Sequence, residues 1–206
     1  MPTVQKNSPA HLKPYSVHGV ALAYREGDKE AVADCPWCGK GQKWYVSTED
    51  GQWKCHRCGE SGNAILFFRK LWETSGTQGL EELAEQRGFL SNEGLEAWGV
   101  VRSVLSGEWL VPGYSADGKI VQLYRYAKDW HTGKMLLQVT PETHHGLFGV
   151  PLYDPKKPDV LLCEGCWDGM ALWEVLHSVK RDGERLAVTA NEGVSLLAAA
   201  NVLATP

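Results

Sequence analysis

The spacing of four cysteines constrains the fold of this chain more than any other feature. Cys35 and Cys38 form one Cys-x-x-Cys pair, and Cys55 and Cys58 form a second pair after sixteen intervening residues. Each pair predicts a tight turn whose two thiols point at one centre, and a closed tetrahedral shell of four thiolates is typical of structural Zn²⁺. In a module this small, the metal replaces a hydrophobic core. We therefore predict that these four cysteines bind zinc.

The segment between the two pairs predicts a β-hairpin, because aromatic and β-branched residues flank the Asp50-Gly51 turn. Aromatic faces can stack on unpaired bases, and cations beside them can contact phosphates. The candidate nucleic-acid contacts on the hairpin and second knuckle are Lys43, Trp44, Tyr45, Trp53, Lys54, His56 and Arg57. The alternative is that the two tryptophans pack against the helix predicted over residues 63–72.

Charge is distributed unevenly along the 206 residues. The net charge is −4, so the molecule as a whole is not a basic nucleic-acid binder. Residues 35–70 nevertheless carry six Lys or Arg against three acids. A basic module on an acidic body can contact a polyanion, although a solvated surface would show the same excess. No apolar run is long enough to span a membrane. The amino-terminal residues contain no apolar signal core, and all six cysteines lie in Cys-x-x-Cys pairs, so we expect a reducing, cytoplasmic setting.

The remaining chain changes from helical to strand-rich patterns. Residues 1–30, with three prolines, predict an irregular segment that includes one candidate strand over 20–24. Short helices are predicted over 80–87 and 92–98, and Gly88 is a candidate stop for the first. Strands are predicted at 110–112 and 120–126. The order strand 159–163, helix 168–177, strand 185–190, helix 195–203 favours a parallel sheet with crossover helices.

The stretch CEGCWDGMAL, residues 163–172, allows two interpretations. Cys163 and Cys166 could form a redox dithiol where a strand meets a helix. Alternatively, the cysteines are packing residues, and the functional groups are the carboxylates of Glu164 and Asp168. Glu164 stands at the carboxyl end of a predicted parallel strand, where open α/β sheets place their sites. Asp168 lies in the first turn of the helix, where a capping role is the alternative. We favour the carboxylates.

The second knuckle and the residues after it, CHRCGESGNAI, together with Cys35-Pro36-Trp37-Cys38, resemble the zinc-binding domain of bacterial and phage-type DNA primases. Many bacterial members have a histidine where this chain has Cys38, so the four-cysteine set is more similar to phage primase–helicases. The resemblance implies that the ribbon helps to select a single-stranded DNA template. It also implies a bacterial cytoplasm or a phage-infected host, and a replicative helicase as a fused or separate partner.

The motif Glu164-Gly-x-x-Asp168-x-x-Ala-Leu is similar to the first motif of the Toprim fold. That resemblance implies a Mg²⁺ site at Glu164 that handles phosphates. The region upstream resembles the amino half of a primase RNA-polymerase domain. The matching features, in chain order, are the stretch that starts at Val111, then Arg125, Lys134, Pro141-Glu-Thr and Leu147-Phe-Gly. Carried over residue by residue, Arg125 and Lys134 contact the phosphates of nucleoside triphosphates or of nascent RNA. The gap between Lys134 and Pro141 is longer than the usual family spacing.

The resemblance implies a fold of α+β and α/β type, in which a β-rich zinc ribbon precedes a partial RNA-polymerase domain with an incomplete parallel Toprim sheet. The expected units are an irregular segment 1–30, a template-binding zinc ribbon 31–75, a helical linker 76–100, an amino-terminal polymerase subdomain 101–157 and a partial Toprim subdomain 158–206.

A second acidic motif of the Toprim fold, Asp-x-Asp, does not occur in the sequence. Two-metal phosphoryl transfer needs several carboxylates, so Glu164 and Asp168 alone are expected to hold Mg²⁺ weakly. Glu192 is a further acidic residue, but no sequence pattern assigns it to the Mg²⁺ site. The expectation is a fragment of a primase, or of a primase–helicase, that is inactive by itself. The alternatives are a naturally short, non-catalytic DNA-binding module, or a relative of the recombination mediators, which also join a four-cysteine zinc site to a Toprim fold.

Overall fold

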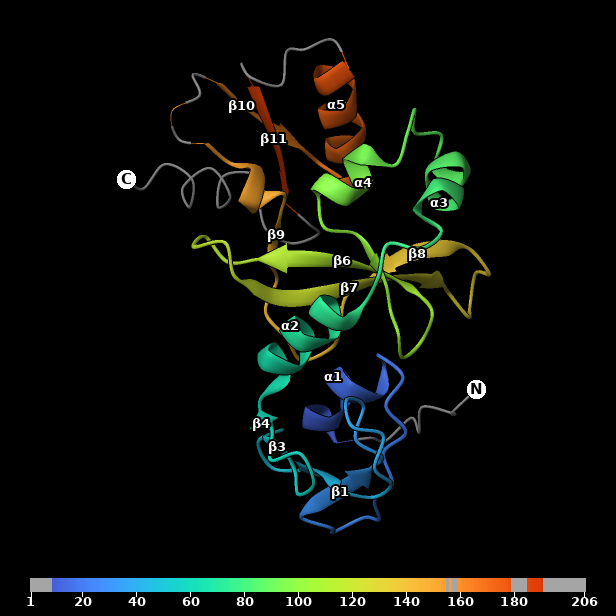
Figure 1. Cartoon of the computed structure of the whole chain (residues 1–206), viewed down its shortest axis with the longest axis vertical. Helices are drawn as coiled ribbons and strands as arrows, with labels where there is room; N and C mark the ends of the chain where they lie inside the picture. The colour runs from blue at the N-terminus through green and yellow to red at the C-terminus, as the bar shows by residue number, and fades with distance from the viewer. Residues whose placement is uncertain (1–8, 155, 157–158, 179–184, 191–206) are drawn as a thin grey trace.

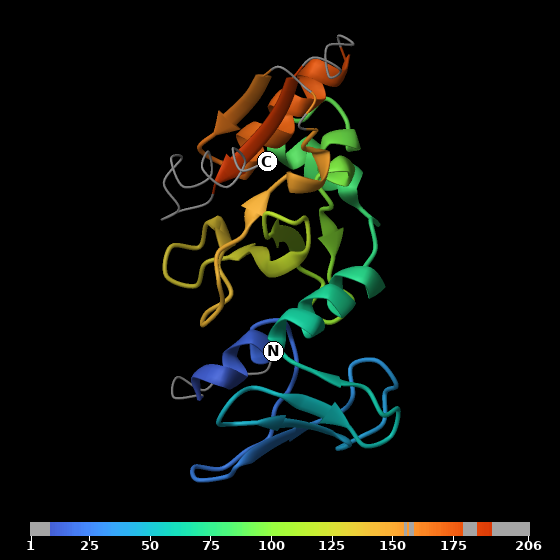
Figure 2. The same cartoon turned by 90° about the vertical axis from the view of Figure 1, so that its left-hand side faces the viewer.

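The computed structural model describes residues 9–154, 156, 159–178 and 185–190, and arranges them in three layers along the long axis of the molecule (Figure 1). A small sheet lies at one end, a larger sheet occupies the middle, and a strand–helix–strand unit lies at the other end. Figure 2, turned by 90°, shows helix α2 (Ala64–Thr74) between the small sheet and the central one. None of the helices in the described ranges is long and apolar enough to cross a membrane.

The amino-terminal segment is more ordered than the sequence predicted. A 3₁₀ turn, η1 (Ala10–Leu12), leads into the short helix α1 (Lys13–Ser16), which Pro14 opens in its first turn. Leu12 and Tyr15 are fully buried. The described part of the expected irregular segment, residues 9–30, is therefore packed, because its few apolar side chains join a core built by residues distant in sequence. The candidate strand over 20–24 is reduced to a single bridge between Ala23 and Val32.

The small sheet has the order β1-β2-β3-β4, with every neighbouring pair antiparallel. Its strands are β1 (Glu30–Ala33), β2 (Trp44–Ser47), β3 (Trp53–Cys55) and β4 (Ser61–Gly62). The predicted hairpin is confirmed as β2–β3, with Trp44 opposite Cys55 and Tyr45 opposite Lys54. Alternation along these strands turns Trp44, Val46 and Trp53 inward and leaves Lys54 exposed.

Helix α2 begins at an Asn63 cap whose side-chain oxygen accepts a hydrogen bond from the Leu66 N–H at 3.1 Å. It buries Phe67, Phe68 and Leu71. The Phe67 ring lies 5.0 Å from that of Tyr15 and 6.1 Å from that of Trp44. Leu110 and Leu123 of the central sheet belong to the same buried cluster. One continuous core therefore joins the small sheet, α2 and the central sheet.

Two further helices follow, α3 (Leu80–Arg87) and α4 (Glu93–Ala97). The first has the predicted limits, and Gly88 ends it in the left-handed conformation with φ of 75°. The second lies within the predicted range of 92–98. Both supply residues, among them Leu83 and Leu95, to a second core on the opposite face of the central sheet.

The central sheet has the order β10-β11-β9-β6-β7-β8, and β5 pairs with β6 off this path. Its strands are β5 (Val101–Arg102), β6 (Trp109–Tyr114), β7 (Ile120–Lys128), β8 (Met135–Gln138), β9 (Leu147–Phe148), β10 (Asp159–Cys163) and β11 (Arg185–Ala190). A 3₁₀ turn, η2 (Val150–Leu152), follows β9. Near the β6–β9 junction, a Cβ on Gly146 would lie 2.5 Å from the backbone of Gly113, so only glycine allows this approach.

Strands β6 and β7 are buried on both faces. Leu110 and Leu123 face the core shared with α2, whereas their neighbours Val111 and Tyr124 face the core shared with α3 and α4. This two-sided burial explains why apolar residues stand next to one another in both strands, as at Leu110-Val111 and Leu123-Tyr124.

The strand–helix–strand unit predicted from the sequence is present in the described ranges. Strand β10 pairs with β11 in parallel, with Leu161 opposite Ala187, and helix α5 (Cys166–Ser178) lies between them in the chain. Strand β9 then pairs with β11 antiparallel. The sheet is therefore mixed, and its parallel part is this one pair. The helix expected over 195–203, and Glu192, lie outside the described residues.

Candidate metal centre and active-site acids

The two Cys-x-x-Cys pairs adopt the same local conformation. In each, the glycine after the second cysteine donates its N–H to the carbonyl of the first cysteine at 3.0 Å, Gly39 to Cys35 and Gly59 to Cys55. Both glycines have positive φ, 65° and 80°, which a residue with a Cβ rarely adopts. The repeated C-x-x-C-G pattern therefore encodes the turn, and the β2–β3 hairpin brings the two turns together.

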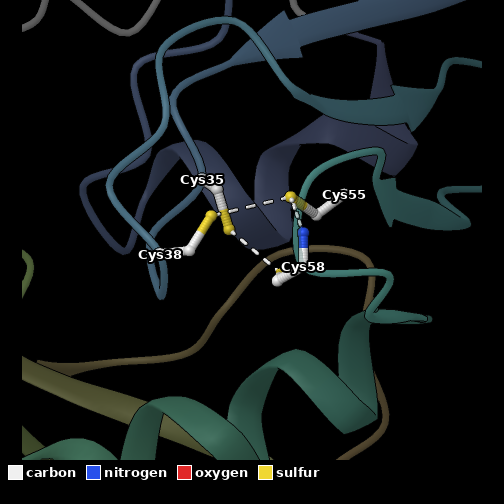
Figure 3. Close-up of side chains that lie close together, drawn as sticks. All are labelled: Cys35, Cys38, Cys55 and Cys58. Atoms are coloured by element: carbon white, nitrogen blue, oxygen red, sulfur yellow. Dashed lines mark hydrogen bonds between the residues drawn. The ribbon is translucent and has the colours of Figure 1, made fainter.

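The four sulfur atoms form a compact cluster (Figure 3), all within 4.8 Å of one another. The Sγ atoms of Cys35 and Cys58 are 4.0 Å apart, and those of Cys38 and Cys55 are 3.8 Å apart. A regular tetrahedron with Zn–S bonds of about 2.3 Å has S···S edges of about 3.8 Å. The donor set and its spacing therefore fit a four-coordinate zinc ion, and the four protein ligands leave no position for a catalytic water.

The backbone of the second knuckle favours the thiolate form of Cys55, and aromatic contacts hold the first knuckle in place. The backbone N–H groups of Arg57 and Cys58 both approach Cys55 Sγ at 3.4 Å. Although burial opposes it, these contacts lower the pKa of Cys55 to about 6. On the side facing α2, the Trp37 ring lies 5.8 Å from that of Phe67 and carries the Lys70 ammonium over its face at 5.3 Å. The knuckles are therefore anchored to the shared core.

The two predicted acids lie at the carboxyl end of β10. Glu164 directly follows the strand and is exposed, and Asp168 is exposed in the first turn of α5. The Asp168 carboxylate turns back over Gly165, where a Cβ would stand 2.9 Å from its Oδ2. Glycine at 165 therefore lets this carboxylate lie against the strand–helix turn. Both acids are accessible to a cation or to a phosphate-bearing ligand.

The two thiols that flank Glu164 both have raised pKa values. Burial, followed by the nearby Asp168 carboxylate, raises the pKa of the half-buried Cys163. Burial raises the pKa of Cys166 to about 12, and this side chain packs in the second core with Met170. Since the thiolate is the reactive form, a raised pKa disfavours redox reactions of these thiols at neutral pH.

The sequence of residues 16–95 matches the family model of the DnaG zinc ribbon, described as the CHC2 zinc finger. This part of the chain is a DnaG-type zinc ribbon. Its ligand set here is four cysteines, with Cys38 at the second position.

Three solved primase structures are similar to this chain at low sequence identity. The primase fragment of the bacteriophage T7 primase-helicase protein is 19% identical, with a TM-score of 0.41, over 85% of this chain and 70% of that chain. The Aquifex aeolicus primase, with its zinc-binding and RNA polymerase domains, is 15% identical, with a TM-score of 0.43, over 93% of this chain and 67% of that chain. The Escherichia coli primase catalytic core is 14% identical, with a TM-score of 0.43, over 68% of this chain and 56% of that chain. No curated protein matches the chain in sequence.

The predicted nucleic-acid contacts of the DnaG-type ribbon fall into two groups, buried side chains and exposed ones. Trp44 and Trp53 are buried, their rings lie 5.6 Å apart, and the Trp53 indole N–H donates to the Asn63 carbonyl at 2.9 Å. The prediction that these tryptophans stack on bases was wrong, because strand alternation turns them into the core. The remaining cationic candidates are exposed: Lys43, Lys54, His56 and Arg57. The half-buried Tyr45 lies beside them, with its ring edge-on to His56 at 5.0 Å.

The Arg125 side chain is engaged within the protein rather than presented to a ligand. Its guanidinium donates to the Val17 carbonyl, to Gln138 Oε1 at 2.7 Å and to Glu108 Oε2 at 3.3 Å. Its side chain is 17% exposed. These contacts tie the amino-terminal segment to β7 and β8. The structure thus shows Arg125 in internal contacts, and its predicted contact with a phosphate stays a prediction. The sequence could not show this, because Val17 lies 108 residues away.

Lys134 is exposed in the loop between β7 and β8, immediately before β8. Its side chain is available to a ligand, and its predicted contact with a phosphate stays a prediction. Lys134 precedes β8, whereas the two acids follow β10, and these strands stand at opposite ends of the strand order of the central sheet.

Glu174 of α5 is a buried acid that the sequence analysis missed. It is 4% exposed and accepts hydrogen bonds from the N–H of Leu90 at 2.8 Å and from the N–H and hydroxyl of Ser91, both at 2.6 Å. It fixes α5 to the α3–α4 connection and so positions the helix that carries Asp168. Its four-residue spacing from the buried Cys166 and Met170 was the available signal.

Proposed function

We propose that this protein is a DNA primase, which synthesises short RNA primers on single-stranded DNA. The observation that carries the proposal is the DnaG-type ribbon: its closed four-sulfur site, and the exposed cations that surround one of its knuckles. In this assignment the ribbon binds the template, and the carboxyl end of β10, at one edge of the central sheet, handles nucleotides.

Template binding by the ribbon is supported by its exposed hairpin face. Lys54 and Tyr45 are paired across β2 and β3, so they present a cation and an aromatic ring on the same face. His56 lies against this ring, and Arg57 is exposed on the adjoining knuckle. A ring with cations on either side is suited to an unpaired base and its phosphates. A zinc ion bound by the four cysteines would hold this surface in shape.

The nucleotide site is assigned to the carboxyl end of β10. Glu164 and Asp168 are exposed carboxylates, a donor set that fits Mg²⁺, which takes one or two carboxylates together with water and substrate phosphates. When bound, the ion would supply neutralisation of charge on the transferring phosphate. In the reaction, a 3′-hydroxyl attacks the α-phosphate of a nucleoside triphosphate; one P–O bond forms, one breaks, and pyrophosphate leaves.

Primer synthesis on an unwound strand requires a source of single-stranded template. We infer that the protein works with a replicative helicase, fused to it or separate. The support for this is the similarity of its four-cysteine set and its motifs to phage primase–helicases.

The test is template-dependent synthesis of oligoribonucleotides by the full-length protein. Single-stranded DNA, labelled nucleoside triphosphates and Mg²⁺ or Mn²⁺ should give short RNA products and pyrophosphate. Glu164→Gln should lower the rate by about 100-fold or more, the scale of losing one electrostatic stabiliser in an active site. Glu85→Gln, at an exposed glutamate of α3, is the matched control and should leave the rate unchanged.

Two outcomes would replace the proposal. Absence of any primer with either metal ion, on templates of varied sequence, would contradict primase activity. A gel-shift preference for gapped duplex over single-stranded DNA, without synthesis, would instead identify a recombination-mediator-like binding protein. Weakened binding to single strands in Lys54→Gln and Arg57→Gln, with Lys29→Gln as the exposed control, would support the ribbon as the template contact.

A further inference from the structure

The β7–β8 hairpin presents an unusual surface at the edge of the central layer, near the label of β8 in Figure 1. Lys128 and Met135 are paired at the ends of the two strands, and residues 129–134 connect them. At the tip of this connection, Trp130 is 75% exposed. The chain has nine tryptophans, all within the described residues, and the other eight are buried or half-buried.

The loop that carries Trp130 is held by its own hydrogen bonds. The Asp129 N–H donates to the Lys134 carbonyl at 2.7 Å, and the Gly133 N–H donates to the Asp129 carbonyl at 2.8 Å. Asp129 Oδ1 accepts from both the N–H and the hydroxyl of Thr132, at 2.7 and 2.8 Å. The backbone is thus fixed while the tryptophan ring is left in solvent. Ordering the loop in advance lowers the entropic cost of binding a ligand there.

The groups around the ring are mainly cationic or aromatic. The His131 ring centroid lies 3.2 Å from that of Trp130, with 34° between the planes. Lys128 and Lys134 are exposed at the two ends of the loop. The one acid of the loop, Asp129, is engaged by Thr132, and these hydrogen bonds lower the pKa of its carboxyl group. The tip therefore combines an exposed aromatic face with two lysines and a bound carboxylate.

We propose that this hairpin is a second contact for single-stranded DNA, in which the Trp130 ring stacks on one base and Lys128 and Lys134 contact the phosphates on either side. Stacking on a tryptophan face accepts any base, and flanking lysines follow the backbone. A protein partner would favour a wider apolar surface without cations at the ends of the loop. The site lies in the central layer, outside the DnaG-type ribbon, so the strand has two separate contacts. This inference deepens the proposed function, because it assigns a further contact to the same template.

The test is the affinity of the full-length protein for a labelled oligothymidylate of about 16 nucleotides, the upper end of the usual site size, measured by fluorescence anisotropy without nucleotides. Trp130→Ala should weaken binding by about 5- to 150-fold, which corresponds to the loss of one stacked base at ~1–3 kcal/mol. Trp130→Phe should keep most of the affinity, because it retains an aromatic face. Leu90→Ala removes another apolar side chain that is 74% exposed, and should have no effect.

Two further measurements separate stacking from general charge attraction. Lys128→Gln and Lys134→Gln should each lower the slope of log affinity against log salt concentration by about 0.7. Trp130→Ala should leave both this slope and heparin binding unchanged. Bound oligonucleotide should also protect one tryptophan from acrylamide quenching in the wild type but not in Trp130→Phe.

Several results would overturn the inference: unchanged affinity in Trp130→Ala, equal losses in the alanine and phenylalanine variants, or a loss seen with RNA of the same sequence but not with DNA. Loss of self-association in Trp130→Ala, with unchanged DNA affinity, would identify a protein contact instead. Because binding is measured without synthesis, a Trp130-dependent affinity in a protein that makes no primer would uphold this site while contradicting the primase assignment.

Discussion

Replacing Phe67 by alanine tests the central structural claim, that the DnaG-type ribbon and the sheet beyond it share one core. Phe67 is fully buried, and its ring has five aromatic neighbours, with centroid distances from 5.0 Å for Tyr15 to 6.2 Å for His18. Truncation of a buried phenylalanine costs ~3–5 kcal/mol. We expect the upper half of this range, because rings anchored on α1, β2 and α2 cannot all move to fill the cavity.

The matched control is the adjacent residue on the same helix. Leu66 is 46% exposed, and alanine has the higher helix propensity, so Leu66→Ala should cost only ~0.5–1 kcal/mol. Because a domain of this size is stable by only ~5–15 kcal/mol, the Phe67 variant should lose a third or more of its stability. The Leu66 variant should remain close to the wild type.

The measurement is urea unfolding of the zinc-loaded protein. Two signals monitor it: far-ultraviolet circular dichroism, and zinc release to a chromogenic chelator. Since the core is continuous, both signals should move to lower urea together in Phe67→Ala. A cost below ~1.5 kcal/mol, or a shift of zinc release alone while the circular dichroism transition stays in place, would refute the shared core.

Three further predictions follow from other buried groups. Removing zinc with a chelator, or replacing Cys35 by serine, should unfold the ribbon and abolish stoichiometric metal binding, measured by metal analysis and circular dichroism. Burial lowers the pKa of His18 from 6.5 to about 3; the unfolded chain then binds the proton first, so the free energy of unfolding should fall by up to ~5 kcal/mol as the pH drops from 6.5 to 3. His18→Asn should flatten this dependence in urea titrations at several pH values, and an unchanged slope would contradict the assignment. Glu174→Ala should cost ~2–4 kcal/mol because it leaves the N–H groups of Leu90 and Ser91 unpaired, whereas Glu174→Gln, which can still accept hydrogen bonds, should cost less when the same unfolding curves are compared.

The features that were predictable from the sequence are those encoded within a few residues. The C-x-x-C-G pattern contains both the ligands and the glycine with positive φ that closes each knuckle, so the zinc site follows from short segments and a hairpin. Helix α3 has its predicted limits, because Gly88 terminates it locally. Strand β10, the turn at Gly165 and the start of α5 likewise follow from an apolar run that ends in a glycine.

The features that were not predictable depend on contacts between distant residues. Helix α1 is packed because Tyr15 meets Trp44 and Phe67. The two-residue strand β9 carries almost no local signal, yet it joins β6 to β11 and so connects the parallel pair to the rest of the sheet. The hydrogen bond from Arg125 to the Val17 carbonyl joins residues that are far apart in the sequence, so only the tertiary structure reveals it.

The sequence by itself determined the metal-binding set, the hairpin between its two halves and the acid that closes the buried strand, since ligand spacing and turn chemistry act over one or two turns of chain. The tertiary structure determines which aromatic side chains are exposed to solvent and can contact a ligand. Trp44 and Trp53 are buried, whereas Trp130 remains in solvent, although all three lie in or beside strands near cations. The face of a strand that becomes the core depends on what packs against it. For β2 and β3 that partner is α2, a helix that the local pattern predicted, although its packing on Trp44 and Trp53 was only one of two alternatives.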